Sequence, residues 1–151
     1  MTLTPSKINS FLIFKLPSAY LCGVRTKVLN KDTCVVKVRH RWINQNPFKS
    51  MFWAVQGMAA ELSTGALVML KIAESGKKIS MLVLGNQSSF TKKATGKIVF
   101  TCHDGHVIQE AIDKTIATGE GQTFWMTSVG VNEDGVEVSS FKFEWSVRVK
   151  N

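Results

Sequence analysis

The sequence lacks an uncharged apolar run of the roughly 20 residues that a membrane-spanning helix needs. Its most apolar stretch, residues 50–72, is interrupted by Glu61 and Lys71. The first residues also lack a basic region that leads into an apolar segment and a small-residue cleavage site, so we expect no secretory signal. Together these absences predict a cytoplasmic protein with no membrane span.

Cysteine is scarce too. The 151 residues contain three, Cys22, Cys34 and Cys102, an odd number without close pairing. A disulfide framework is therefore not expected, and reduced thiols fit a cytosolic protein better. Cys34 and Cys102 lie in strand-like sequence and are expected in the core. His103 and His106 have no evident third strong ligand nearby, so a loop and helix cap is favoured over a metal site.

Acidic residues are outnumbered by basic ones, and the net charge is +8. This favours an anionic partner, either nucleic acid, a membrane surface or a phosphorylated small molecule. No run of five or more basic residues is present, which argues against nucleic acid. Lys37, Arg39 and Arg41 alternate with apolar residues in 33–42, so they form either a solvated strand face or a track for phosphates such as those of coenzyme A.

The length of 151 residues and the 44% hydrophobic content suit one globular domain over residues 1–151. We expect a helical segment at 1–18 to pack on its body. The stretch 50–72 is rich in Ala, Leu and Met and apolar on nearly every side, which predicts a long helix buried all round. Asn46 and Pro47 suit its N-cap and first helical position.

Short helices and alternating apolar segments surround this long helix. The expected order is a helix at 6–16, strands at 23–30 and 33–42, the long helix, strands at 79–90 and 97–102, a second helix at 105–117, and strands at 121–131 and 136–149. Turn residues between neighbouring strands imply hairpins, and hence an antiparallel sheet in an α+β domain. Gly85 is expected to mark a bulge in its strand.

The predicted long helix carries one acid, Glu61. At 100° per residue, mostly small residues share its side of the helix. They either leave room beside the carboxylate or allow close packing of the helix on the sheet. In the first case we expect the substrate to contact Ser50, Ala54, Gly57 and Gly65 on this side of the helix. Lys49, the residue just before the predicted helix, is expected to contact the substrate as well.

Two motifs resemble a known family. Residues 46–52, NPFKSMF, lead to Glu61 and resemble the loop and helix of hotdog thioesterases, where an Asn precedes the helix and an acid lies within it. Residues 90–96, FTKKATG, resemble the F-x-K-P-[AV]-x-G turn of the same proteins, with Lys93 in place of the Pro.

The end of the chain extends this resemblance. Asp134-Gly135 and residues 143–147, FEWSV, are similar to the end of an uncharacterised, thioesterase-like bacterial branch of the hotdog superfamily. The resemblance, which covers residues 23–149, implies a curved antiparallel sheet of about six strands wrapped around one long central helix.

The same resemblance implies a homodimer, or a dimer of dimers, whose sheets join edge to edge. An acyl-thioester pocket, usually for acyl-coenzyme A, would lie at the subunit interface. In family terms Glu61 corresponds to the helix acid and Asn46 to the polar residue ahead of the helix. No cofactor is expected beyond the coenzyme A of the substrate.

Thioester hydrolysis needs an activated water and a stabilised oxyanion. Glu61 in apolar surroundings would have a raised pKa and act as general base, or attack directly as nucleophile. The helix N-terminus and Asn46 would polarise the carbonyl, and Thr64 would orient the carboxylate or the water. Related thioesterases often carry Gly near the position of Lys49, where the backbone can approach the carbonyl closely. The Cβ and charge of Lys49 depart from that pattern, so the oxyanion hole either is not formed there or uses another amide.

Other interpretations remain at this stage. Asn46 serves equally as a cap without catalysis, Glu61 as one half of an ion pair with a partner chain, and Thr64 as a hydroxyl bonded to its own helix. The main alternative function is a non-catalytic acyl or lipid binding module on the same fold. A nucleic-acid-binding protein is favoured by charge alone.

Overall fold

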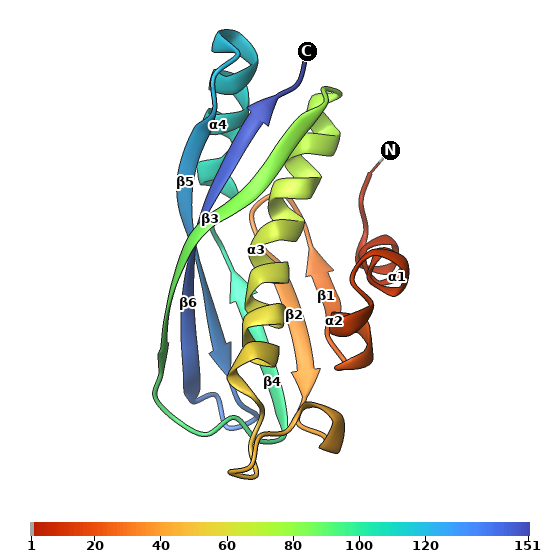
Figure 1. The fold of residues 1–151 in the computed structure, drawn as a ribbon, viewed down its shortest axis with the longest axis vertical. Helices are drawn as coiled ribbons and strands as arrows, with labels where there is room; N and C mark the ends of the chain where they lie inside the picture. Colours follow the sequence, from red (N-terminus) through yellow and green to blue (C-terminus); the bar gives the residue numbers. More distant parts are fainter. Residues whose placement is uncertain (1) are drawn as a thin grey trace.

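One long helix lies across a six-stranded antiparallel sheet in the computed structural model, which describes residues 2–151 (Figure 1). The helices are α1 (Pro5–Lys15), α2 (Pro17–Leu21), the 3₁₀ helix η1 (Trp42–Asn44), α3 (Trp53–Ser75) and α4 (Gly105–Thr118). The strands are β1 (Arg25–Leu29), β2 (Cys34–Arg39), β3 (Ile79–Phe90), β4 (Lys97–Cys102), β5 (Gln122–Val131) and β6 (Glu137–Val149).

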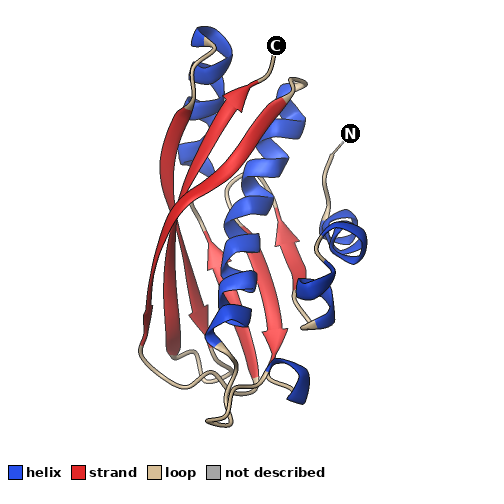
Figure 2. Ribbon diagram, viewed as in Figure 1, coloured by secondary structure: helices blue, strands red, loops and turns tan. Residues whose placement is uncertain are grey.

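The sheet has the order β1-β2-β4-β5-β6-β3, with every neighbouring pair antiparallel. Strands β1 and β3 therefore form its two edges. Figure 2 shows the long strands β3, β5 and β6 twisting on one side of α3, and α1 and α2 on the other side. The predicted α+β class, with about six antiparallel strands and one long central helix, is confirmed.

Helix α3 packs mainly against β1, β2, β4, β5 and β6, and near Gly65 it also approaches Met81 of the edge strand β3. Its middle is fully buried, at Ala66, Leu67 and Val68, because those apolar side chains find the sheet on one side and other elements around them. Helix α4 packs against α3, β5 and β6. The long apolar helix thus forms the centre of the core, as the sequence predicts.

Two predicted helix boundaries are wrong. Helix α3 begins at Trp53 rather than at 50, since residues 46–51 close into a loop through a bridge between Gln45 and Met51. Asn46 is therefore not the N-cap and Pro47 is not a first helical residue; Phe52 holds the N-cap position. Pro17 does not simply end the N-terminal helical segment, because it begins the short helix α2, a position that its fixed φ suits.

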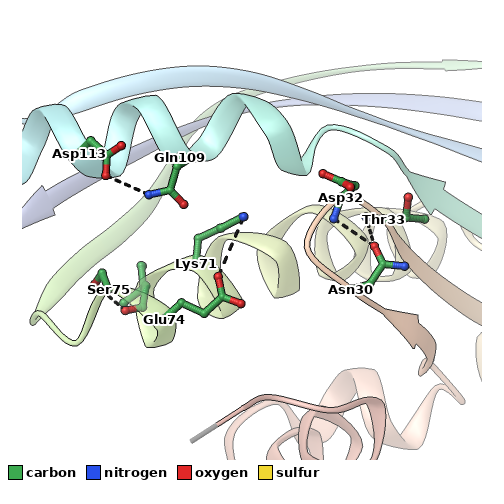
Figure 3. A network of polar contacts seen from close by, with 9 residues as sticks. Asn30, Asp32, Thr33, Lys71, Glu74, Ser75, Gln109 and Asp113 are labelled. Carbon is green, nitrogen blue, oxygen red and sulfur yellow. Dashed lines mark hydrogen bonds and ion pairs between the residues drawn. The ribbon is translucent and has the colours of Figure 1, made fainter.

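Two predicted hairpins, β1–β2 and β5–β6, are confirmed, whereas β3 and β4 do not form one, because β3 pairs with β6 and β4 pairs with β2 and β5. Asn30 Oδ1 accepts hydrogen bonds from the backbone N–H groups of Asp32 (3.0 Å) and Thr33 (2.9 Å), which closes the β1–β2 hairpin (Figure 3). The register of β3 with β6 shifts between Val83 and Gly85, as a bulge requires. Cys34 and Cys102 lie opposite each other on β2 and β4, fully buried, and burial raises the pKa of both thiols to about 12.

Gly130 provides a test of the packing between the sheet and the core. A Cβ at this position would lie 2.5 Å from Cε1 of the fully buried Phe100. We expect Gly130→Ala to lower the free energy of unfolding by about 1–3 kcal/mol, because the ring must move within a packed core. Urea denaturation measures this change.

Gly85→Ala is the matched control. Gly85 also lies in a strand beside a register shift, but no atom lies within 4 Å of a Cβ built there. The control should lose much less stability than Gly130→Ala. Equal losses would show that backbone freedom, and not the Phe100 contact, explains the glycine at 130.

Candidate functional site

Glu61 lies on the wall of an apolar pocket of about 210 Å³ between α3 and the two N-terminal helices. The lining comes from α1, α2, their junction, α3, β3 and β6, and it is largely apolar. Its members are Phe11, Leu12, Lys15, Leu16, Ala19, Met58, Glu61, Leu62, Gly65, Met69, Met81 and Trp145. Glu61 therefore lies beside an open space, as the sequence predicts.

The carboxyl group of Glu61 is unusual in its electrostatics. Desolvation by its surroundings raises the pKa of Glu61 above the ordinary glutamate value. Neither of the two ion pairs among residues 2–151 includes Glu61: Arg39 pairs with Glu133, and Lys71 pairs with Glu74. Glu61 nevertheless remains accessible to solvent, and Lys15 lines the same pocket. A carboxyl group with a raised pKa is suited to general-base chemistry.

Thr64 does not serve the carboxylate, which corrects the expectation that it orients Glu61 or a water. Its hydroxyl donates to the Glu61 backbone carbonyl at 2.8 Å and accepts from Trp145 Nε1 at 2.9 Å. Gly65 makes room for the same ring, since a Cβ there would lie 3.2 Å from Trp145 Cζ2. Thr64 and Gly65 thus fix the indole that lines the pocket.

Asn46 organises the loop ahead of α3. Its Oδ1 accepts from the backbone N–H groups of Phe48 (2.9 Å) and Ser50 (3.1 Å), and its Nδ2 donates to the Ser50 hydroxyl (3.0 Å). Lys49 has a φ of 60°, in the left-handed region that favours glycine. Ser50 is buried inside this loop.

The start of α3 offers backbone donors. Phe52 supplies no side-chain cap, and its carbonyl accepts from the N–H groups of Val55 and Gln56. The N–H groups of Trp53 and Ala54 have no acceptor within the helix and remain for a ligand. These donors and the helix dipole favour a developing negative charge.

A second pocket, of about 380 Å³, opens at this helix start. Its lining residues are Asn46, Phe48, Ser50, Trp53, Gln56, Phe90, Lys92, Lys93 and Ala94. Gln56 is buried; its Nε2 donates to the Met51 carbonyl at 3.3 Å, while its Oε1 has no partner among the described residues. Gln56 lies about 140° from Glu61 around α3, so the two side chains face different directions.

The two pockets share no lining residue. Glu61 follows Trp53 by eight residues, which corresponds to about 12 Å along a rigid helix. The predicted site residues are therefore divided: Gly65 lies with Glu61, whereas Asn46 and Ser50 lie at the helix start.

Three expected substrate contacts line neither pocket. Gly57 packs against the sheet, since a Cβ there would lie 3.5 Å from Phe141 Cε1. Ala54 is half-buried and Lys49 is exposed. Close packing on the sheet, which the sequence left open as one role for the small residues, explains Gly57.

Neither His103 nor Asp104 belongs to a metal-binding cluster. No group of three potential ligands occurs among residues 2–151. Asp104 holds the N-cap position of α4, but its Oδ2 accepts from the Thr127 backbone N–H at 2.7 Å instead of capping the helix. Within the described part of the chain, no helix is long and apolar enough to cross a membrane.

Residues 6–147 match the family model described as a domain of unknown function (DUF4442). The chain belongs to this family. Comparison with the curated proteins finds no match.

Solved structures with the same architecture carry thioesterase names. A protein of unknown function from Pseudomonas aeruginosa, described as a probable thioesterase, has a TM-score of 0.82 and 21% identity, and the match covers 99% of each chain. A thioesterase from Haemophilus influenzae has a TM-score of 0.76 and 14% identity over 99% of this chain and 93% of that one. Zebra fish thioesterase superfamily member 2 has a TM-score of 0.67 and 10% identity over 99% and 100%.

Identities this low establish the fold alone. They confirm the expected hotdog fold.

The raised pKa of Glu61 predicts a pH-dependent stability. The folded chain holds the Glu61 proton to a higher pH than the unfolded chain, so it binds more protons between the ordinary pKa and the raised one. Stability therefore falls as the pH rises through that window. We expect Glu61→Gln to raise the melting temperature near neutral pH and to lose this advantage below the ordinary carboxyl pKa. Thermal melts across pH measure this, and a difference that stays constant with pH would contradict it.

Proposed function

We propose that the protein hydrolyses acyl thioesters, with acyl-coenzyme A as the substrate class, at a site completed by two copies of the chain. Glu61 from one copy activates the water or attacks the carbonyl. The helix start of the other copy binds the carbonyl oxygen, and Asn46 of that copy positions the loop ahead of the helix. The observation that carries this proposal is the carboxyl group of raised pKa on the wall of an apolar pocket.

The proposed site needs two chains because a single chain keeps Glu61 away from the N–H groups at the start of α3. The rigid helix holds Glu61 about 12 Å from the N–H groups that would stabilise an oxyanion. In a two-fold dimer with adjacent helices running antiparallel, the interior of one helix lies opposite the beginning of the other. A homodimer of this kind supplies both groups to each of two equivalent sites.

The free edge of β3 supports such a dimer. This strand has one sheet neighbour, β6, and its Leu82 and Leu84 side chains are 63% and 51% exposed. A long edge strand with exposed apolar residues is a template for pairing with another strand. Joining two β3 edges would cover these residues and extend the sheet across both copies.

The chemistry follows from the division of the site. Glu61 removes a proton from water as the oxygen attacks the thioester carbon, and the N–H groups of Trp53 and Ala54 receive the developing oxyanion. Collapse of the tetrahedral intermediate releases the thiolate, which takes a proton, and the carboxylic acid. Direct attack by Glu61 to give an anhydride, followed by hydrolysis, uses the same groups.

The two pockets suit the two parts of an acyl-coenzyme A. The apolar pocket beside Glu61 accepts an acyl chain, and its 210 Å³ lies below the roughly 300–1,000 Å³ of common ligand pockets, which favours a small acyl group. Lys92 and Lys93 on the second pocket provide cations for the coenzyme A phosphates. The three free thiols suit a reducing compartment such as the cytosol.

A non-catalytic acyl-binding module is the second candidate. Two observations favour it: Thr64 is fully engaged with Trp145, and Lys49 occupies a backbone position that glycine suits. In this case acyl-coenzyme A would bind without release of thiol.

Glu61→Gln separates the two candidates. With a panel of acyl-coenzyme A substrates, we expect the variant to lose at least about 100-fold in kcat while it still folds and binds, since removal of a general base costs about 10²–10⁴. Thiol release measured with a chromogenic reagent reports the rate.

Glu74→Gln is the control, since Glu74 lies exposed on the same helix. It should keep the wild-type rate. Unchanged turnover in Glu61→Gln would remove Glu61 from the mechanism, and acyl binding by a wild-type protein that releases no thiol would favour the binding module.

Complementation tests the shared site. We expect Glu61→Gln and Asn46→Ala homodimers to be inactive. A heterodimer of the two, purified through different tags, should have one intact site in two and recover about half of the wild-type rate. If Asn46→Ala destabilises its loop, Asn46→Asp retains the acceptor oxygen and serves instead. A heterodimer as inactive as its parents would show that both groups act from the same chain.

A further inference from the structure

Exposed apolar and basic side chains are carried by α1, α2 and the segment of η1, which lie on the same side of α3 (Figure 1). We call this the basic-apolar corner; it consists of Phe14, Lys15, Leu21, Arg41, Trp42 and Ile43. The residues come from α1, α2 and η1, and Figure 2 shows η1 as a short helix beneath α2. The corner lies across the sheet from the free edge of β3.

The apolar members of the corner are unusually exposed. Trp42 is 82% exposed, Phe14 79%, Leu21 65% and Ile43 51%. Scattered apolar residues are normal on a protein surface, but several large ones gathered together mark an interaction site. None of the four belongs to either pocket of the proposed thioesterase site.

Hydrogen bonds join η1 to the chain directly after α2. The buried Asn44 at the end of η1 donates from Nδ2 to the Cys22 carbonyl (2.9 Å), directly after Leu21, and to the Arg39 carbonyl (2.8 Å). Its Oδ1 accepts from the Arg41 backbone N–H at 2.8 Å. Asn44 therefore holds η1, and with it Trp42 and Ile43, against the end of α2.

The net charge of the protein lies in the same part of the chain. The first 60 residues contain nine Lys and Arg and one acid, Asp32, whereas residues 61–151 contain ten of each sign. The whole excess of +8 therefore belongs to the segment that forms α1, α2, β1, β2, η1 and the start of α3. Near the corner, Glu133 pairs with Arg39 at 3.6 Å and leaves Arg41 and Lys15 outside both ion pairs of residues 2–151.

A surface of this composition matches an anionic lipid bilayer. Trp and Phe enter the headgroup region, where their rings are favourable, and Lys and Arg bind the lipid phosphates. A second copy of the chain is a poorer fit, because the excess positive charge would repel its own kind. We propose that the basic-apolar corner binds the protein peripherally to an anionic membrane surface. This inference is independent of the thioesterase proposal.

Vesicle sedimentation with the full-length protein tests the inference. We expect the protein to sediment with phosphatidylcholine–phosphatidylglycerol vesicles and to remain in solution with phosphatidylcholine alone. Binding should weaken strongly between about 0.1 M and 1 M salt, as the Debye length shrinks from about 10 Å to 3 Å. Arg41→Gln should reduce the partition coefficient about fivefold, the effect of one basic residue near such a surface.

Trp42→Ala and Trp125→Ala form the decisive pair. Both rings are exposed, but Trp125 lies on β5, away from the corner. We expect Trp42→Ala to lower the partition coefficient at least tenfold and Trp125→Ala to leave it within twofold of wild type. Equal effects of the two variants, equal binding to neutral vesicles, or no binding to anionic vesicles would overturn the proposal. Release of the protein from vesicles by duplex DNA at equal phosphate would also overturn it, in favour of a nucleic-acid surface.

Discussion

The stiffness of α3 is the constraint on which the account of this protein depends. A helix with continuous hydrogen bonds cannot bring its third turn back to its beginning, so Glu61 stays about 12 Å from the free N–H groups at Trp53 and Ala54. Both groups suit thioester chemistry, but one chain keeps them in separate pockets. The proposed dimer follows from this geometry and agrees with the exposed edge of β3.

The Trp145 indole beside Glu61 is held in place by two neighbouring residues of α3. Thr64 receives the indole N–H of Trp145 and donates to the helix backbone, while Gly65 lets the ring approach the helix. The indole is buried and hydrogen-bonded, and it forms part of the wall beside the carboxyl group. Thr64 and Gly65, which lie close to Glu61 in the sequence, thus shape the pocket wall through Trp145 and do not orient the Glu61 carboxyl group.

Much of the fold can be predicted from the sequence because local patterns determine it. Alternation in β2, the apolar continuity of α3 and the bulge at Gly85 each depend on a few residues, and the structure confirms them. The strand predicted at 33–42 is shorter than expected, because β2 ends at Arg39 and η1 begins at Trp42. The beginning of α3 is different. Asn46 and Pro47 have the residue types of a helix start, but Asn46 bonds to the loop backbone up to Ser50 and holds that segment out of the helix. Local propensity favours both arrangements, and tertiary contacts decide between them.

The candidate site was predictable only in part for a similar reason. Glu61 stands out as the one acid in the apolar stretch 50–72, and the structure places it beside a pocket. The separate pocket at the helix start, the unpartnered Oε1 of Gln56 and the bond between Thr64 and Trp145 depend on strands far along the chain. The sequence pattern of residues 50–72 alone does not indicate those contacts.

A crystal structure with a non-hydrolysable acyl-coenzyme A analogue would test the central claim most directly. The account predicts a homodimer in which the carbonyl oxygen of the analogue lies about 3 Å from the N–H groups of Trp53 or Ala54 of one copy, the distance of an oxyanion hydrogen bond. The Glu61 carboxylate of the other copy would face the same carbonyl carbon. An analogue bound with both groups from one chain, or with Glu61 turned away from the carbonyl, would contradict the account.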